Sequence, residues 1–96
     1  MRPSEALAKN IDAVRAIIAR YPVANPRVFG SVARGDDHEG SDVDLLVDDS
    51  EGLTYFDLAK MQVELEDCLG VRVDVGIADA LRPRVSEAVM RDLRAL

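Results

Sequence analysis

Two aspartates separated by a single residue, Asp42 and Asp44, are the part of the sequence best suited to chemistry. They open a β-prone run over residues 43–47, so both side chains are expected on one face, with Cα atoms roughly 6.5–7 Å apart. Proteins bind Mg²⁺ with one or two carboxylates together with phosphate oxygens and retained waters. The pair therefore predicts one or two magnesium ions beside a phosphate-bearing substrate. Taken alone, it also fits a solvated strand end.

A third carboxylate, Asp74, lies in a segment in which valines alternate with polar residues or glycine. This period of two indicates a strand over residues 71–75, with the valines on the inner face and Asp74 on the opposite face. Asp74 would complete a three-carboxylate site if this strand lies beside the strand of Asp42 and Asp44. The sequence does not reveal that adjacency.

A glycine turn precedes the acidic pair, with Gly30 and Ser31 at its start and Arg34 and Gly35 at its end. Glycine permits tight backbone shapes, and the N–H groups that open a helix attract phosphate oxygens. The Ser31 hydroxyl adds a donor. The Walker pattern is absent because no Gly-Lys-Ser/Thr follows these glycines. The residues thus indicate an acidic metal site beside a turn that could hold a triphosphate.

Seven elements are expected to position these residues. The hydrophobic spacing predicts a helix over residues 4–21 with Ser4 as its N-cap, and a second helix over residues 53–69 that ends at Gly70. The remaining expected segments are a strand at 27–29, a short helix at 31–34, a polar loop at 35–40, a strand at 43–47, a turn at 48–52, the strand at 71–75, and a last helix from Pro83.

This order predicts an α/β (α+β) fold, a small mixed β-sheet with helices packed on one face and the other face free for a site. With 96 residues, the chain is expected to form a single domain over residues 1–96. So small a domain leaves no room for a separate acceptor-binding domain. We therefore expect the acceptor to be held by a partner or by a second copy.

The net charge of −6 is distributed unevenly, with fourteen acidic and two basic side chains in residues 35–79. An acidic middle does not suit nonspecific duplex binding, so no direct contact with duplex nucleic acid is expected. Asp36, Asp37 and Glu39 are interpreted as a solvated acidic loop. The sequence contains no run apolar enough to span a membrane and its start does not resemble a signal peptide, so a cytoplasmic protein is expected.

The run from Gly30 to Val47 resembles the signature of the DNA polymerase β-like nucleotidyltransferase superfamily. Its parts are Gly-Ser, an Arg-Gly shortly after, and Ser-Asp-x-Asp followed by apolar residues. The small size and the Val-Asp-Val around Asp74 are similar to the minimal nucleotidyltransferase branch, often called MNT or MntA-like. The resemblance covers roughly residues 24–77. It implies the polymerase β-like nucleotidyltransferase fold.

The resemblance also implies roles for individual residues. Asp42, Asp44 and Asp74 would be the catalytic carboxylates and metal ligands, with Asp74 close to the attacking hydroxyl as ligand or base. Nucleotide binding would fall to Gly30, Ser31, Arg34 and Ser41. Arg34 would either contact phosphates or brace the acidic loop, and the Ser41 hydroxyl could instead cap the start of the strand.

Many members of the minimal branch resemble antitoxins paired with a HEPN-domain ribonuclease toxin. The resemblance thus implies Mg²⁺-dependent transfer of AMP from the nucleoside triphosphate ATP to a toxin tyrosine. Two alternatives stay open: a small-molecule acceptor such as an aminoglycoside, or a non-catalytic module that neutralises its partner by occlusion.

Several other side chains favour structural explanations. His38 is expected to be solvated, Tyr55 and Phe56 to pack rather than stack on bases, and Cys68 to be a small packing or half-exposed residue. Four arginines near the end would form either a docking surface or a solvated helix face; they are Arg82, Arg84, Arg91 and Arg94.

Overall fold

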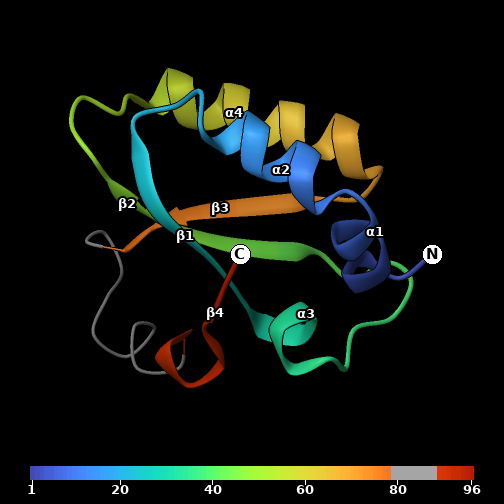
Figure 1. The fold of residues 1–96 in the computed structure, drawn as a ribbon. Helices are drawn as coiled ribbons and strands as arrows, with labels where there is room; N and C mark the ends of the chain where they lie inside the picture. The colour runs from blue at the N-terminus through green and yellow to red at the C-terminus, as the bar shows by residue number, and fades with distance from the viewer. Residues whose placement is uncertain (79–88) are drawn as a thin grey trace.

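A four-stranded mixed sheet forms the centre of the protein, whose computed structural model describes residues 1–78 and 89–96. The strands lie in the order β3-β2-β1-β4 (Figure 1). They are β1 (Val23–Phe29), β2 (Val43–Asp49), β3 (Val73–Ile77) and β4 (Arg94–Ala95). β1 is antiparallel to both β2 and β4, whereas β2 and β3 are parallel. The predicted small mixed sheet is thereby confirmed.

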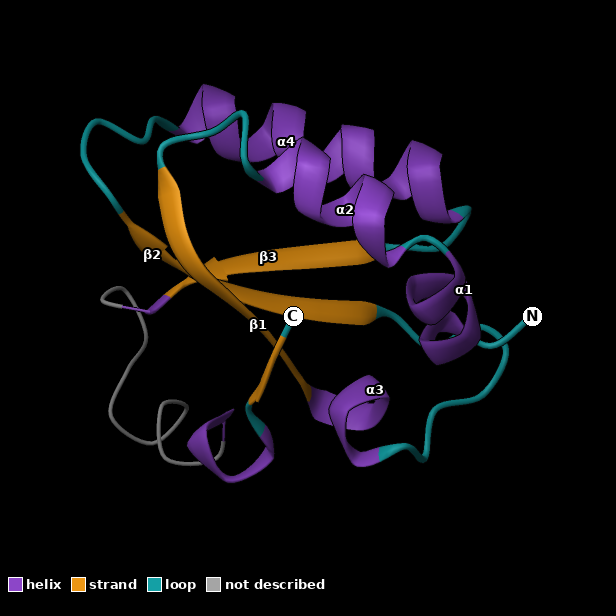
Figure 2. Cartoon of the chain, viewed as in Figure 1, coloured by secondary structure: helices purple, strands orange, loops and turns teal. Residues whose placement is uncertain are grey.

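Helices cover one face of this sheet. α2 (Ile11–Ile18) and α4 (Tyr55–Leu69) lie side by side over it, and α1 (Pro3–Lys9) lies at one end of this layer. The short α3 (Gly30–Arg34) lies at the end of β1, on the other side of the sheet (Figures 1 and 2). The long helices thus pack on one face of the sheet, as the sequence predicts.

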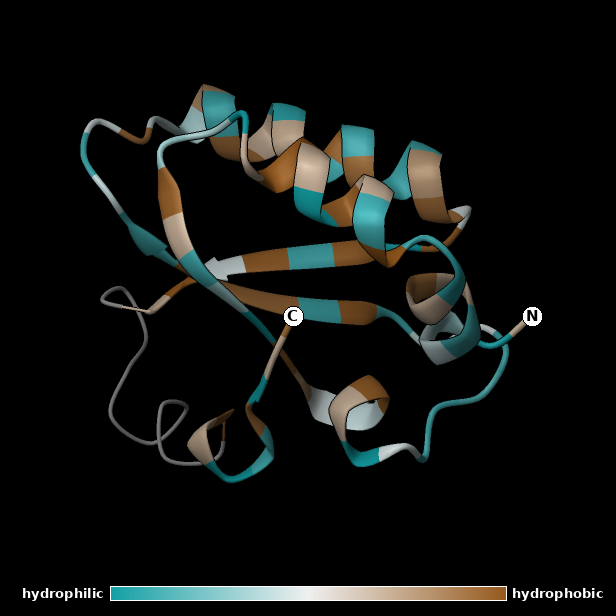
Figure 3. Ribbon diagram, in the orientation of Figure 1, coloured by the Kyte–Doolittle hydropathy of each residue, from teal (hydrophilic) through white to brown (hydrophobic). Residues whose placement is uncertain are grey.

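The hydrophobic core fills the space between the helices and the sheet. Figure 3 shows apolar segments of α2 and α4 turned toward the strands and polar segments turned outward. Leu45 and Leu65, which are 1% and 0% exposed, lie in this layer. Since burial of such side chains is the main stabilising term in folding, the core fixes β2 under α4 and sets the orientation of its outer face.

The helix predicted over residues 53–69 is α4, which begins at Tyr55, two residues later than predicted, and ends at Leu69 as predicted. The Thr54 hydroxyl accepts a hydrogen bond from the Asp57 N–H at 3.1 Å, and the Asp57 carboxylate accepts one from the Thr54 N–H at 3.2 Å. Gly70 ends the helix with a left-handed φ of 70°. This reciprocal cap and the glycine stop explain why the predicted helix ends at Leu69.

The single helix predicted over residues 4–21 is wrong. The helix breaks at Asn10, whose φ and ψ of −114° and 20° are not helical and whose side-chain amide donates to the Ala6 carbonyl at 2.9 Å. Ser4 is not the N-cap, because α1 begins at Pro3 and the cap position belongs to Arg2. Asparagine competes with the helix for backbone partners, and periodicity alone does not show such a break.

The strands around the site extend further than predicted. β1 begins at Val23, with Asn25 at a φ of +52° beside the register irregularity between Ala24 and Arg27. β2 runs on through Asp48 and Asp49, which the sequence places in a turn. The pairing of β1 with β2 extends both strands past their apolar runs.

The face opposite the helices is not entirely free. Leu46 alternates with Leu45 and lies on that face, yet it is 2% exposed, and Val89 is 6% exposed. The C-terminal segment lies on that side, with a helical turn over residues 89–92 that leads into β4 (Figure 1). Most of the helix predicted from Pro83 lies outside the described residues, as do Arg82 and Arg84.

None of the helices formed by residues 1–78 and 89–96 combines the length and apolar character needed to cross a membrane.

Candidate active site

Asp44 lies at the centre of the candidate site. It faces Asp74 across the parallel β2–β3 pair and Phe29 across the antiparallel β1–β2 pair. Facing residues of neighbouring strands project to the same side of a sheet and lie about 5 Å apart. The structure therefore supplies the strand adjacency on which a joint site of Asp44 and Asp74 depends. Asp74 is exposed while Val73 is 1% exposed, so it points away from the helices.

Gly30 lies directly against the Asp44 carboxylate. A Cβ atom built on Gly30 would lie 2.6 Å from Asp44 Oδ2, closer than real Cβ contacts allow. Gly30 also has a φ of +73°, which favours glycine. The glycine therefore allows the start of α3 to approach the carboxylate, and any other residue would push the two apart.

The electrostatics of Asp44 oppose its charged form. Burial raises the pKa of its carboxyl, and Asp74 and then Asp42 raise it further, while Arg34 lowers it. Three carboxylates within electrostatic reach of one another create a negative site, and a bound cation would relieve their repulsion.

Asp42 lies just before β2, on the same side as Asp44 by alternation. Its Oδ1 is 3.9 Å from Nε of Arg72, whose side chain is 81% exposed. The Val43 N–H donates to the Arg72 carbonyl at 2.9 Å, which ties the start of β2 to the start of β3. So weak and exposed an ion pair leaves the Asp42 carboxylate available for another ligand.

The three aspartates are not gathered into a finished metal site. Within the described parts of the chain, no group of three or more His, Cys, Asp or Glu side chains is placed to hold a metal ion. Mg²⁺ commonly takes only one or two carboxylates and completes its shell with substrate phosphates and waters. The hard oxygen donors of Asp42 and Asp44 therefore suit this ion, even though no closed cage exists.

α3 carries the predicted phosphate-binding residues. It opens at Gly30 with no side-chain cap, so the N–H groups of its first turn have no helical partner. The Ser31 carbonyl accepts from the Gly35 N–H at 2.9 Å, and Gly35 ends the helix at a φ of 79°. The turn thus places uncapped N–H groups next to Asp44.

Arg34 braces the acidic loop, which is one of its two predicted roles. Its Nε donates to Asp36 Oδ2 at 3.1 Å and its Nη1 donates to Asp92 Oδ2 at 2.8 Å. The phosphate contact is not excluded by these bonds, because a guanidinium has five N–H donors.

Ser41 closes the loop in front of the site. Its Oγ accepts from the His38 N–H at 3.1 Å and its N–H donates to the His38 carbonyl at 3.0 Å. The hydroxyl therefore braces the start of the strand, as its alternative role requires. His38 is exposed, as predicted.

A groove of about 620 Å³ borders one side of the site. Its lining includes Ser41, Asp42, Glu66, Asp67 and Arg72. It does not reach Asp44, Asp74 or Gly30. The groove therefore lies next to the carboxylate pair rather than around it.

The prediction that Asp37 is solvated is wrong. Asp37 is 4% exposed, and its Oδ2 accepts a hydrogen bond from the Ser4 N–H at 2.8 Å. Burial raises the pKa of Asp37, but the hydrogen bonds from Ser4 and the charge of Arg2 outweigh it and bring the pKa below its usual value. Asp37 thus satisfies the start of α1 and anchors the loop that leads to Asp42. Of its loop neighbours, Asp36 and Glu39 are exposed as expected.

The prediction that Tyr55 and Phe56 pack is also wrong. These side chains are 90% and 77% exposed at the start of α4. Cys68 is half-buried, as expected. Arg91 and Arg94 are exposed.

Asp92 is a residue that sequence reasoning does not single out. It lies 58 positions from Arg34 in the chain and carries no local motif. Its only signal is an acid between two C-terminal arginines, Arg91 and Arg94.

Comparisons with known proteins show the family to which the chain is similar. Residues 11–96 match the family described as the nucleotidyltransferase domain. The protein adenylyltransferase MntA of Thermococcus cleftensis is 36% identical over 74 residues, which are 77% of this chain and 75% of that protein.

Two solved structures are similar. A candidate minimal nucleotidyltransferase is 45% identical with a TM-score of 0.85, covering 97% of this chain and 95% of that chain. A chain from the complex of the tri-AMPylated Shewanella oneidensis HEPN toxin with MNT antitoxin is 17% identical with a TM-score of 0.66, covering 97% of this chain and 70% of that chain. At that identity the likeness concerns the fold.

Proposed function

The chain belongs to the nucleotidyltransferase domain family, and from this premise we propose that it transfers AMP from ATP to a hydroxyl group of a partner protein. The observation that carries the proposal is the pairing of Asp44 with Asp74 beside Gly30. It brings two carboxylates and an uncapped helix start to one side of the sheet. A nucleoside triphosphate needs both features, one for its cation and one for its phosphate oxygens.

In this proposal Asp42, Asp44 and Asp74 are the catalytic carboxylates. Asp42 and Asp44 would hold Mg²⁺, with Asp74 as a further ligand or as the base that takes the proton of the attacking hydroxyl. When bound, the ion stabilises charge on the attacking and leaving oxygens. The raised pKa of Asp44 supports its place beside a cation, because the carboxylate lacks full compensation without one.

The triphosphate would lie at the start of α3. The Gly30 and Ser31 N–H groups and the Ser31 hydroxyl would donate to its oxygens, and Arg34 would add positive charge. Ser41 would act mainly by holding the loop in front of Asp42, since its hydroxyl already accepts from the His38 N–H. These residues orient the α-phosphorus for in-line attack, and such positioning supplies much of the rate enhancement.

The acceptor we propose is a tyrosine of a HEPN-type toxin, so that the protein acts as an antitoxin in the cytoplasm. The tyrosine Oη would form a bond to the α-phosphorus as the α–β phosphoanhydride bond breaks, releasing pyrophosphate. Two similarities support this choice: MntA of Thermococcus cleftensis is a protein adenylyltransferase, and a chain of similar fold comes from the complex of a tri-AMPylated HEPN toxin with its MNT antitoxin. The groove beside Asp42 offers the acceptor segment an approach to the carboxylates.

The test is transfer of label from α-labelled ATP in the presence of Mg²⁺. The chain would be co-expressed with the protein encoded beside it, comparing wild type with Asp44→Asn. Asp48→Asn is the matched control, because Asp48 lies on the same strand and face but pairs with Arg27 instead. We expect label on the neighbouring protein with wild type and Asp48→Asn, and none with Asp44→Asn.

Two other results would redirect the proposal. Label on an added aminoglycoside, with none on the neighbour, would favour a small-molecule acceptor. A neighbour that stays bound and neutralised without any label would favour neutralisation by occlusion.

A further inference from the structure

Arg34 is held at two points by carboxylates from different parts of the chain. Nε donates to Asp36 at 3.1 Å and Nη1 donates to Asp92 at 2.8 Å. A guanidinium has five N–H donors, so three remain. Within residues 1–78 and 89–96, these three form no other hydrogen bond. The two carboxylates therefore fix the guanidinium while leaving one edge available to a ligand.

Asp92 comes from a segment that is itself anchored. Val89, three residues before it, is buried, and two residues after it β4 pairs with β1 through Arg94 and Ala95. The Leu96 N–H donates to the Pro26 carbonyl at 3.2 Å. The Asp92 carboxylate is only 25% exposed. The Asp92–Arg34 bond thus attaches the end of α3 to a fixed point on the edge of the sheet.

The charge of the Arg34 side chain acts on Asp44, one of the carboxylates of the proposed site. In the part of the chain that the structure describes, Arg34 is the positive charge that acts on the Asp44 carboxyl, and it opposes the effects of burial, Asp74 and Asp42. The guanidinium therefore lies within electrostatic reach of the place where we propose that the triphosphate binds.

We propose that Asp92 is a positioning residue for nucleotide binding, which holds the Arg34 guanidinium with its free N–H donors toward the triphosphate. The inference rests on the proposed function. A long arginine side chain loses rotamer freedom when it binds a ligand, and a side chain that is already fixed avoids most of that loss. Asp92 touches neither the nucleotide nor the reacting atoms, so its effect passes through Arg34.

Charge and positioning predict opposite results when Asp92 is removed. Loss of a negative charge near a triphosphate would by itself strengthen binding. Loss of the anchor would weaken binding, because Arg34 would then have to be ordered by the nucleotide. Weaker binding by Asp92→Ala therefore reports positioning and not charge.

The experiment is titration calorimetry of the full chain with Mg²⁺ and a non-hydrolysable α,β-methylene analogue of ATP. Wild type, Asp92→Ala, Arg34→Ala and the double variant form a cycle. We expect Asp92→Ala to bind roughly fivefold more weakly, the size expected for ordering one flexible side chain. In the Arg34→Ala background the same change should have no further effect. Asp92→Asn, which keeps an oxygen acceptor for Arg34, should retain most of the affinity.

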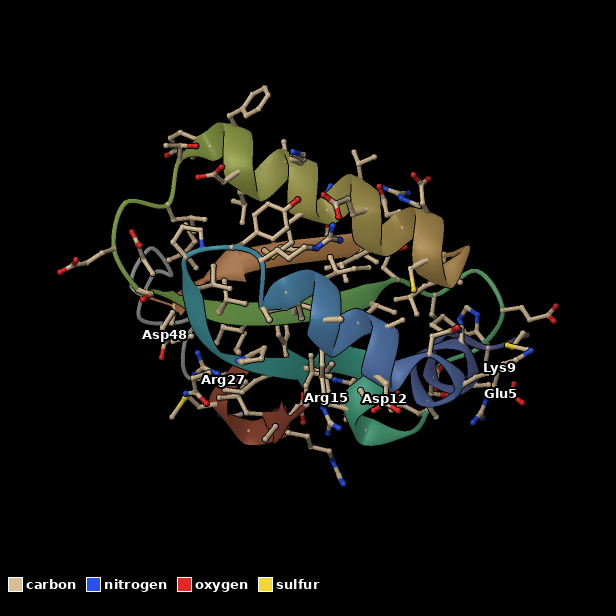
Figure 4. The ribbon with its side chains drawn as sticks, turned by 45° about the horizontal axis from the view of Figure 1, so that its top comes forward. Glu5, Lys9, Asp12, Arg15, Arg27 and Asp48 are labelled. Carbon is tan, nitrogen blue, oxygen red and sulfur yellow. The ribbon has the colours of Figure 1, made fainter. Side chains whose placement is uncertain are left out.

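Asp48→Ala is the matched control for loss of an ion pair on the same sheet. It breaks the ion pair of Arg27 and Asp48, which are both labelled in Figure 4. Asp48 lies four residues after Asp44 on β2, which is about 13 Å along the strand. We expect it to leave the affinity unchanged. If Asp92→Ala does not fold, Asp92→Ser takes its place, since serine is too short to hold Arg34.

Three results would overturn the inference. Unchanged or tighter binding by Asp92→Ala would show that the anchor does not matter. An equal loss of affinity in the Arg34→Ala background would show that Asp92 acts by another route. Wild type that binds no analogue would overturn the proposed function itself, and the inference with it.

Discussion

A side chain at position 30 and the Asp44 carboxylate exclude each other, since a Cβ on Gly30 would lie 2.6 Å from Asp44 Oδ2. Gly30→Ala should therefore displace either α3 or the carboxylate. We expect a loss of label transfer of about 100-fold or more, because displacements of about 1 Å have effects of this size at active sites.

Gly52→Ala is the control for this prediction. Gly52 has a φ of +77°, close to that of Gly30, but a Cβ there would meet nothing within 4 Å. It should share the backbone strain without the collision and keep its activity. Equal losses in the two variants would attribute the effect to strain and not to the approach of Gly30 to Asp44.

Asp44→Asn should separate stability from activity. The pKa of Asp44 is raised, so the folded state disfavours the charged carboxylate. The resulting loss of folding stability is absent below the unfolded pKa near 4, grows as the pH rises, and is complete above the folded pKa. At pH 7 without divalent ions, the variant should thus be more stable in urea by a few tenths to about 1 kcal/mol, since the group is partly solvated. It should lose label transfer.

The same comparison should be repeated with Mg²⁺. The ion should raise the urea midpoint of wild type, because it binds the folded state, and have little effect on Asp44→Asn. The advantage of the variant without Mg²⁺ should shrink as the pH falls to 4. A variant that is less stable than wild type at pH 7 would contradict the assignment of Asp44 as an uncompensated charge.

Asp37 should make stability sensitive to acid. Its pKa is lowered, so its contribution is present above the unfolded pKa near 4 and is lost as the pH falls through the lower folded pKa. Asp37→Ala should cost about 1 kcal/mol at pH 7, as the loss of a helix-capping side chain does. The difference from wild type, measured by urea unfolding, should diminish below pH 4. Asp12→Ala, at a side chain that is 98% exposed, should change neither the free energy of unfolding nor its dependence on pH.

The sequence predicts the local elements of the site because their signals are local. The acidic pair, the glycine turn and the stop of α4 at Gly70 are each visible within a few residues, and the structure places them as expected. Thr54 and Gly70, for example, define α4 through contacts with residues no more than four positions away.

The remaining features depend on contacts between distant residues. In the sequence Asp37 is an ordinary loop acid, and its role depends on the fold bringing Ser4, 33 positions earlier, against it. Asp92 gains meaning only through Arg34, and the pairing of Asp74 with Asp44 depends on strand order. β4 has two residues and exists because β1 offers it an edge. No local periodicity encodes any of these four relationships.

The two tyrosines of the chain should respond to substitution in opposite ways. Tyr21 donates a hydrogen bond to Glu64, which also pairs with Arg20, so these residues join the end of α2 to α4. Burial, together with the bond to Glu64, raises the pKa of Tyr21 to about 12. Tyr21→Phe should cost about 1–2 kcal/mol in urea unfolding at pH 7, since it leaves Oε1 of the half-buried Glu64 carboxylate without its donor.

Tyr55→Phe is the matched control. The side chain of Tyr55 is 90% exposed, so its change should stay within about 0.5 kcal/mol. Because the folded pKa of Tyr21 lies above the unfolded value of 10, the difference between wild type and Tyr21→Phe should be constant below pH 10 and decrease as the pH rises from 10 toward 12. Neither variant alters the carboxylates or α3, so both should retain label transfer. A Tyr21→Phe variant as stable as wild type would show that the packing of α2 on α4, rather than this hydrogen bond, holds the two helices together.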